Sequence, residues 1–416
     1  MYDPYTEFTK HVLPNGLEVQ SIFWDRAWIR MKIVVHSGGR EDPVVMPGLA
    51  HFVEHMVSCN IPNHEFDQVK EFFETCGGKA EFGSTSYLST HYEFSVPADR
   101  ITFREALTIF GSMLLGALLK KDVEKERKII FREFNVKYPF LEKLNWDMGI
   151  RKALFKGHRL ETWNRPLGRP EGFLSATEPD LQGFYDQHYV PANISLVIIG
   201  GLPTKEVIVE LEKSPFGVQK SGTRNQIPQP FGTLPIPTEQ RKTVKLSDHV
   251  TFKVDQTEYK ATWAFPANFP RQACRVFGQV LEKILFDEIR EKRELAYSIG
   301  SSYRGFHDVY EYEINCKISP EATPYIDELV RKCISMVPSR HDLFDRKLKS
   351  CKQSCLMIDL SGSGLASSSA GDLVSDHRVI PMQEVWDELH KVTYEQMAEA
   401  ATLLSSDRQY TFITCP

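Results

Sequence analysis

Apolar and polar residues alternate along the start of the chain, which is the pattern of strands with one buried face. The alternation covers His11 to Phe23, with the turn signal Asn15-Gly16 inside it, and then Trp28 to His36. Helical periodicity follows in Leu49 to Val57 and in Phe66 to Thr75. This order predicts a sheet whose first strands precede two amphipathic helices.

The remainder of the first half mixes helices and strands in the same way. Alternating aromatic residues predict a strand from Thr90 to Val96, and an apolar run predicts another from Ile194 to Ile199. Helical periodicity covers three further ranges, 103–120, 122–136 and 178–188. Strands, helices and strands in this order predict an α+β domain, with a largely antiparallel sheet and helices packed on one face.

The second half repeats this theme. A strand is predicted at Tyr259 to Phe265, a helix at Arg271 to Lys292, and aromatic strands follow through Tyr303 and Tyr310. The triplets Tyr92-Glu93-Phe94 and Tyr310-Glu311-Tyr312 end comparable passages of the two halves, which is a weak indication of an internal repeat. We therefore expect two similar α+β domains.

A proline-rich stretch separates the halves. It runs from Ser214 to Pro237 and contains five prolines together with Gly, Gln and Thr, a composition typical of an extended linker. We expect a first domain at residues 1–213, a linker at 214–246 and a second domain at 247–416.

Composition limits the functional classes. Charged residues make up 25% of the chain and the net charge is −5, so the basic surplus needed to bind a phosphate backbone is missing. The longest apolar run, Ile109 to Leu119, is about half the length that crosses a bilayer. The first residues lack the basic and apolar regions of a secretory signal. We expect a cytoplasmic protein without nucleic-acid or membrane partners.

Two further features of the sequence do not indicate a catalytic or binding site. The eight cysteines lie at irregular positions and are expected to be reduced core residues, including the helical pair Cys351 and Cys355. The Gly/Ser-rich run at residues 361–369 lacks the Gly-Lys-Ser or Gly-Lys-Thr ending of a phosphate loop. Close helix packing or a flexible turn fits this run better.

The segment from His51 to His55 reads His-Phe-Val-Glu-His, an H-x-x-E-H pattern with Glu54 at its fourth position. On a helix the two imidazoles share a face and can converge on one metal ion. The pattern arises by chance in about three chains per hundred of this composition, and a surface helix with two solvated histidines would look the same. Catalytic zinc usually takes three protein ligands, so a third donor must come from elsewhere.

Two carboxylates could supply that donor. Glu126 and Glu133 lie two turns apart on one face of the helix predicted at 122–136. By spacing alone, a solvated acidic stripe is the better interpretation of such a pair. The choice between a metal ligand and a solvated acidic stripe therefore needs evidence from outside this helix.

Over nearly its whole length the chain resembles the pitrilysin-type inverzincin metallopeptidases, the group of insulysin and mitochondrial processing peptidase. The resemblance rests on Gly39-Arg40-Glu41 before the motif helix, on the motif itself and on the downstream glutamates. It implies that His51, His55 and Glu133 hold Zn²⁺ and that Glu126 supports the site from outside. It also implies that Glu54 acts as general base.

The same resemblance assigns substrate-binding roles. Arg290 and Tyr297 look like the arginine and tyrosine that hold the substrate backbone, and Tyr297 would also stabilise the oxyanion. Four residues, Ala80, Glu81, Phe82 and Gly83, stand where the family has the edge strand that receives the peptide. This sequence lacks the Asn-Ala pair usual there, so substrate preference is left open.

The resemblance implies a zinc metalloendopeptidase acting on peptides or small unfolded polypeptides. Because the chain has half the length of the large two-lobed members, two chains should close around a chamber, as a homodimer or as a heterodimer with a paralogous chain. Two alternatives remain: a non-catalytic subunit of a heterodimeric peptidase of this family, and an unrelated metal-binding module.

Overall fold

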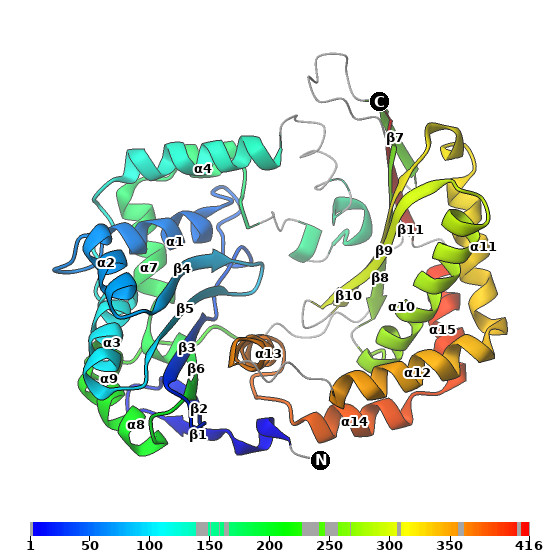
Figure 1. Cartoon of the computed structure of the whole chain (residues 1–416). Coiled ribbons are helices and arrows are strands. Elements are labelled where there is room, and N and C mark those ends of the chain that lie inside the picture. Colours follow the sequence, from blue (N-terminus) through cyan, green and yellow to red (C-terminus); the bar gives the residue numbers. More distant parts are fainter. Residues whose placement is uncertain are drawn as a thin grey trace. The chain divides into compact units, whose positions relative to one another are not determined.

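The computed structural model describes residues 3–138, 149, 151–157, 159–161, 166–226, 241–245, 257–266, 268–305, 309–356, 362–405 and 409–415. The chain forms two compact units, each with one sheet and its own helices (Figure 1). Unit 1 comprises Met1–Lys137, Trp163–Gln226 and Ile358–Met382, and unit 2 comprises Tyr138–Thr162, Ile227–Met357 and Gln383–Pro416. Both units mix helices with a sheet, which confirms the predicted α+β class.

The sheet of unit 1 has six strands in the order β1-β2-β6-β3-β5-β4. Only β2 and β6 run parallel, and the other neighbours are antiparallel. The bounds are β1 Thr9–Val12, β2 Glu18–Phe23, β3 Trp28–Val35, β4 Lys79–Thr85, β5 Thr90–Pro97 and β6 Ile194–Gly200. The predicted strands of the first half are therefore confirmed.

Helices cover the apolar face of this sheet. The main ones are α1 Leu49–Cys59, α2 Phe66–Thr75, α3 Arg100–Leu115, α4 Val123–Lys137, α6 Pro170–Ser175, α7 Glu178–His188, α8 Thr204–Lys213 and α9 Pro215–Val218. Phe94 of β5 packs against Phe103 and Phe110 of α3, with ring centroids 6.2 and 5.0 Å apart. All three rings are buried, so alternate residues of the central strands supply the core beneath the helices.

The opposite face of the sheet is charged. Glu93 of β5 accepts hydrogen bonds from Arg30 at 2.7 Å and from Lys32 at 3.0 Å, both on the neighbouring strand β3. These side chains alternate with the apolar ones because successive residues of a strand point to opposite faces. Paired charges tolerate partial burial where single charges would not.

Helix α13, Gly362–Ser375, packs on this charged face against β3 and β6 (Figure 1). Its first residue has no room for a side chain, since a Cβ on Gly362 would lie 2.0 Å from the Trp28 ring. Ser367 lies 3.2 Å from the Lys32 ammonium group. The Gly/Ser-rich run thus allows close helix packing, one of its two predicted roles.

Unit 2 repeats the topology of unit 1. Its five strands follow the order β7-β11-β8-β10-β9, and β7 and β11 run parallel. This matches β2-β6-β3-β5-β4, strand for strand. The bounds are β7 Arg241–Lys245, β8 Thr257–Pro266, β9 Ala296–Gly305, β10 Val309–Ile318 and β11 Gln409–Cys415. The two triplets that suggested a repeat lie on the matching strands β5 and β10.

Helices complete unit 2. They include α10 Arg271–Leu285, the π-helical turn Phe286–Glu291, α11 Ile326–Met336, α12 His341–Leu356, α14 Met382–Lys391 and α15 Tyr394–Ser405. The predicted helix at 271–292 therefore changes its winding after Leu285. Cys351 and Cys355 are buried on α12, and the cysteines described are free thiols.

The predicted linker contains regular structure at both ends. Helix α9 and strand β7 fall within 214–246, while residues 227–240 and 246 lie outside the described part of the chain. The units are also not continuous in sequence, because 358–382 belongs to unit 1. The domain bounds 1–213 and 247–416 stay a prediction.

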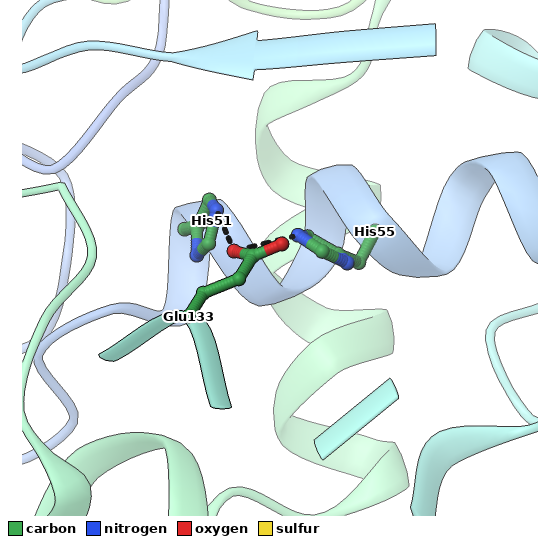
Figure 2. A group of neighbouring side chains, drawn as sticks. All are labelled: His51, His55 and Glu133. Carbon is green, nitrogen blue, oxygen red and sulfur yellow. Dashed lines mark ion pairs between the residues drawn. The ribbon is translucent and has the colours of Figure 1, made fainter. Parts of the chain in front are cut away.

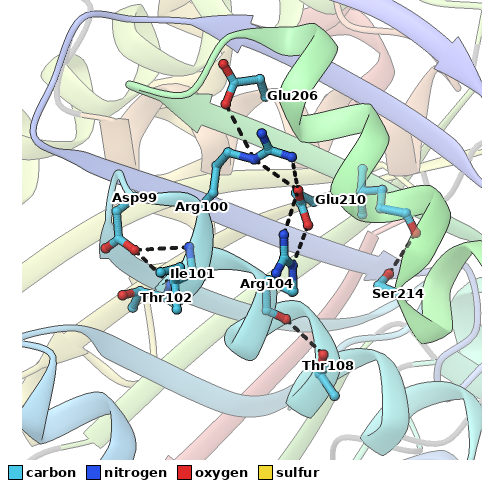
Figure 3. A network of polar contacts seen from close by, with 10 residues as sticks. Asp99, Arg100, Ile101, Thr102, Arg104, Thr108, Glu206, Glu210 and Ser214 are labelled. Atoms are coloured by element: carbon cyan, nitrogen blue, oxygen red, sulfur yellow. Dashed lines mark hydrogen bonds and ion pairs between the residues drawn. The ribbon is translucent and has the colours of Figure 1, made fainter.

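An ion-pair network joins α3 to α8 (Figure 3). The Glu210 carboxylate is buried and accepts hydrogen bonds from Arg104 Nε at 2.7 Å and from Arg100 Nη2 at 2.5 Å. These hydrogen bonds lower the pKa of Glu210 from 4.5 to about 2, and the bond from Arg104 has the largest effect. The ionised carboxylate therefore stabilises the helix contact above pH 4.5, and this contribution is lost as the pH falls toward 2.

No helix among the described residues is long and apolar enough to span a membrane.

Candidate metal centre

Helix α1 presents its polar residues toward α4. Its buried face carries Leu49, Phe52, Val53 and Met56, which leaves His51 and His55 on one partly exposed stripe. The helix begins after Gly48, whose φ of +98° favours glycine. The spacing of apolar residues alone thus orients both imidazoles.

The structure brings both imidazoles to the carboxylate of Glu133 on α4 (Figure 2). Glu133 Oε2 lies 3.6 Å from His51 Nε2 and 3.6 Å from His55 Nε2. One ligand atom from each of the three residues lies within 4.8 Å of the others. The two rings stand nearly edge to face, with centroids 4.7 Å apart.

This donor set fits zinc. Zinc binds imidazole nitrogen and carboxylate oxygen at about 2.0 to 2.2 Å in a tetrahedral arrangement, which places neighbouring ligand atoms roughly 3.3 Å apart. The two nitrogen–oxygen distances of 3.6 Å are close to that spacing. Three protein donors leave a fourth position for water or substrate, as catalytic zinc sites do.

The second glutamate of α4 contacts His55 from its other side. Glu126 is buried, and its Oε2 lies 3.2 Å from His55 Nδ1. A carboxylate in this place fixes the ring orientation and makes the opposite nitrogen a better donor. Burial by itself lowers the pKa of His55, but its contacts with Glu126 and Glu133 outweigh burial and raise it to about 10. A metal ion must therefore displace a proton from this imidazole.

The two histidines differ in protonation. Burial and, to a smaller extent, the neighbouring His55 together lower the pKa of His51 to about 4. The contact with His55 lowers the pKa of Glu133, although 44% of its side chain is exposed. His51 is thus neutral and Glu133 ionised near neutral pH, which are the forms that bind metal.

Glu54 is held beside the triad by two neighbours. The residue is 8% exposed, and Thr85 Oγ1 donates a 2.7 Å hydrogen bond to Glu54 Oε2. Gly83 approaches so closely that a Cβ there would lie 2.2 Å from Glu54 Oε1, and its φ of +152° also favours glycine. Burial raises the pKa of Glu54, while the Thr85 hydrogen bond opposes this shift.

The predicted edge strand is β4, which is the outer strand of the sheet and contains a β-bulge between Glu81 and Ser84. Glu81 is exposed, whereas the Phe82 ring stacks on Phe110 at 5.7 Å in the helix-covered layer. Gly83 lies within this bulge, directly beside the Glu54 side chain. Of the four residues predicted on the edge strand, Phe82 therefore packs inside the domain, a contact that the sequence did not indicate.

Arg290 and Tyr297 belong to unit 2. Arg290 lies in the π-helical turn, with its guanidinium carbon 5.1 Å from the centroid of the Phe286 ring. Tyr297 lies at the start of β9 and is 73% exposed. Both roles assigned to them stay predictions.

Sequence reasoning missed two supporting residues. Asp42 is half-buried and accepts hydrogen bonds from the main-chain nitrogens of Gly48 at 2.6 Å and Ala50 at 2.8 Å, which anchors the start of α1. Thr85 was not singled out either. No local pattern marks either residue, because the N-cap position of α1 is Gly48 and Asp42 lies outside it.

Comparisons with known proteins show which sequences this chain resembles. The family model described as insulinase (peptidase family M16) matches residues 27–158, and the model described as peptidase M16 inactive domain matches residues 175–337. The uncharacterized zinc protease Mb2805c of Mycobacterium bovis is 24% identical over 322 residues, which cover 74% of this chain and 70% of that protein.

Solved structures share the fold. A protease from Helicobacter pylori has a TM-score of 0.82 at 18% identity, covering 98% of this chain and 99% of its own. The periplasmic protease PqqL from Escherichia coli has a TM-score of 0.80 at 15% identity, with 98% of this chain matching 47% of that one.

Proposed function

Because the chain belongs to the insulinase (peptidase M16) family, we propose that it is a zinc-dependent endopeptidase that hydrolyses peptides or small unfolded polypeptides. The observation that carries this proposal is the convergence of His51, His55 and Glu133 within 4.8 Å, with the buried carboxylate of Glu54 beside them. Three ligands and an adjacent base are the parts that hydrolysis of an amide requires.

The residues of this chain have distinct roles in the proposed reaction. Zinc, when bound by the triad, polarises the scissile carbonyl and acidifies water. Glu54 accepts the proton from the attacking water and later returns it to the leaving amine. Thr85 and Gly83 hold the Glu54 carboxylate in place. The raised pKa of Glu54 suits a group that must both accept and donate a proton.

Substrate binding is proposed at two places. An extended peptide adds as a strand to β4, an outer strand whose free edge can accept main-chain hydrogen bonds. Tyr297 donates to the developing oxyanion and Arg290 to a substrate carbonyl. The exposure of Tyr297 supports a role outside the core.

Metal removal tests the proposed function. The purified protein is dialysed against a chelator, and cleavage of a fluorogenic peptide is measured before and after zinc is returned. We expect cleavage to fall at least about 100-fold without metal and to recover with zinc, because the metal supplies several kcal/mol of transition-state stabilisation. Cleavage that persists in fully metal-free protein would contradict the proposal.

A non-catalytic subunit is the second candidate function. The match to a model described as inactive domain is the observation that favours it. That match begins at residue 175, beyond His51, Glu54, His55 and Glu133, so it does not concern the residues of the metal centre. Zinc binding without cleavage of any peptide, alone or with a paralogous chain, would favour this candidate.

We further propose that two chains enclose a chamber, as a homodimer or with a paralogous chain. The support is that this chain matches about half of the longer protease PqqL, so that two copies equal one molecule of that length. A cytoplasmic location stays a prediction from the sequence.

Mixing two inactive variants tests a shared site. If Tyr297 acts on the metal centre of the partner chain, a mixed dimer of Glu54→Gln and Tyr297→Phe has one doubly altered site and one intact site. Random exchange makes about half of the dimers mixed, so roughly a quarter of the sites should recover activity. Subunit exchange is followed with differently tagged chains. No recovery despite exchange would exclude the shared-site homodimer.

A further inference from the structure

Arg127 follows Glu126 on α4 and makes contacts that the proposed chemistry does not use. Its side chain is 12% exposed, although it carries a permanent charge. A guanidinium held this deeply needs partners for its N–H groups. One partner is Glu124 on the same helix, whose Oε1 accepts a hydrogen bond from Arg127 Nε at 3.1 Å. The other partners come from two other helices, α1 and α6.

The contact with α1 is to an aromatic ring. The Arg127 guanidinium carbon lies 5.2 Å from the centroid of the Phe52 ring, within the range of a cation–π interaction. Phe52 is fully buried and directly follows His51. The guanidinium therefore contacts the helix that carries both candidate imidazole ligands.

The contact with α6 is to its carboxyl end. Arg127 Nη1 donates to the carbonyl of Phe173, and Nη2 donates to that of Ala176 at 2.8 Å. Carbonyls at the end of a helix lack intrahelical donors and carry partial negative charge, so a guanidinium is a favourable partner. The Phe173 ring also packs on Phe134 of α4, with centroids 5.8 Å apart.

Together, consecutive residues of α4 contact two points of α1. Glu126 contacts His55, and Arg127 contacts Phe52, one helical turn earlier. Two contacts one turn apart restrict both sliding and rotation of α4 against α1. Glu133 lies two turns beyond Glu126 on the same helix. Its position opposite the histidines therefore depends on how the Glu126 and Arg127 contacts align α4 with α1.

We propose that Arg127 is a positioning residue for the metal centre, which clamps α4 to α1 and α6 so that Glu133 stays opposite His51 and His55. The inference rests on the proposed metal-binding function of these three residues. Glu133 is 44% exposed and the contacts shown for it are with the two histidines, so the position of its carboxylate follows that of its helix.

Metal affinity provides the test. Arg127→Met keeps an apolar stem but loses the N–H donors, and Arg132→Met is the matched control because Arg132 is exposed on the same helix. Zinc dissociation constants are measured by competition with a chelator, and Co²⁺ absorption reports ligand geometry. We expect Arg127→Met to bind zinc about 10 to 100 times more weakly and to change the Co²⁺ spectrum, with Arg132→Met unchanged.

Two further variants guard against general unfolding. Arg127→Lys keeps the charge and most of the volume, yet an ammonium group cannot serve both carbonyls and the ring as a planar guanidinium does, so we expect weakened metal binding here too. In Arg127→Ala, added millimolar guanidinium should restore the Co²⁺ spectrum. Unchanged metal affinity in folded Arg127→Lys and Arg127→Met would overturn the inference. If the unaltered protein bound no metal, the proposed function itself would fail.

Discussion

Glu54→Gln should retain zinc and lose peptide cleavage. The amide is close in shape to the carboxylate and can still contact Thr85, so the packing against Gly83 is retained. It cannot accept a proton from water at neutral pH. Because loss of a general base typically costs 10²- to 10⁴-fold, kcat/KM should fall by at least about 100-fold.

The control for this prediction is Glu74→Gln, which makes the same chemical change at an exposed position of α2. Zinc content is measured by elemental analysis and cleavage with a fluorogenic peptide. A Glu54→Gln protein with more than about a tenth of the original rate would remove Glu54 from the proton transfer. Loss of zinc in the same variant would instead indicate a structural role.

Glu133→Ala should weaken zinc binding far more than Glu126→Ala. Glu133 contacts both ring nitrogens that face the centre, whereas Glu126 contacts the far nitrogen of His55. Loss of a residue that orients a ligand typically costs 10- to 100-fold in metal affinity. Loss of a ligand should exceed that range and also remove activity.

Competition with a chelator ranks the two variants, with Glu74→Ala as the control and circular dichroism as the check on folding. Because Glu126 is buried and Glu133 is partly exposed, Glu126→Ala should cost more folding stability even though it costs less metal affinity. The opposite order of zinc affinities would make Glu126 the third ligand.

The part of the site that could be predicted from the sequence is the part fixed by helix geometry. Residues four apart on α1 share a face, and residues seven apart on α4 share another, so spacing alone placed His51 with His55 and Glu126 with Glu133. Periodicity describes only local structure, so it could not predict that α1 and α4 contact each other. That contact was predicted only from the resemblance to a family.

Contacts between distant segments explain what was missed. Gly83 approaches Glu54 from within a β-bulge in β4. A bulge inserts one extra residue into a strand, and the alternation of apolar and polar residues does not predict where this happens. The clamp formed by Arg127 was missed for a related reason, since its partners outside α4 are a ring on α1 and two main-chain carbonyls. Likewise, the sequence predicted β8, α10, β9 and β10 of the second half, but not that α13 packs on the first sheet.

The position of α13 has a consequence for the order in which the protein matures. A ribosome delivers the strands of the first sheet early, and with them the helices that carry the proposed metal ligands. The covering helix at 362–375 is made only after most of unit 2. Until then Arg30, Lys32 and the Trp28 ring face solvent or a chaperone. The sheet of the amino-terminal half is therefore synthesised long before the helix that covers its charged face.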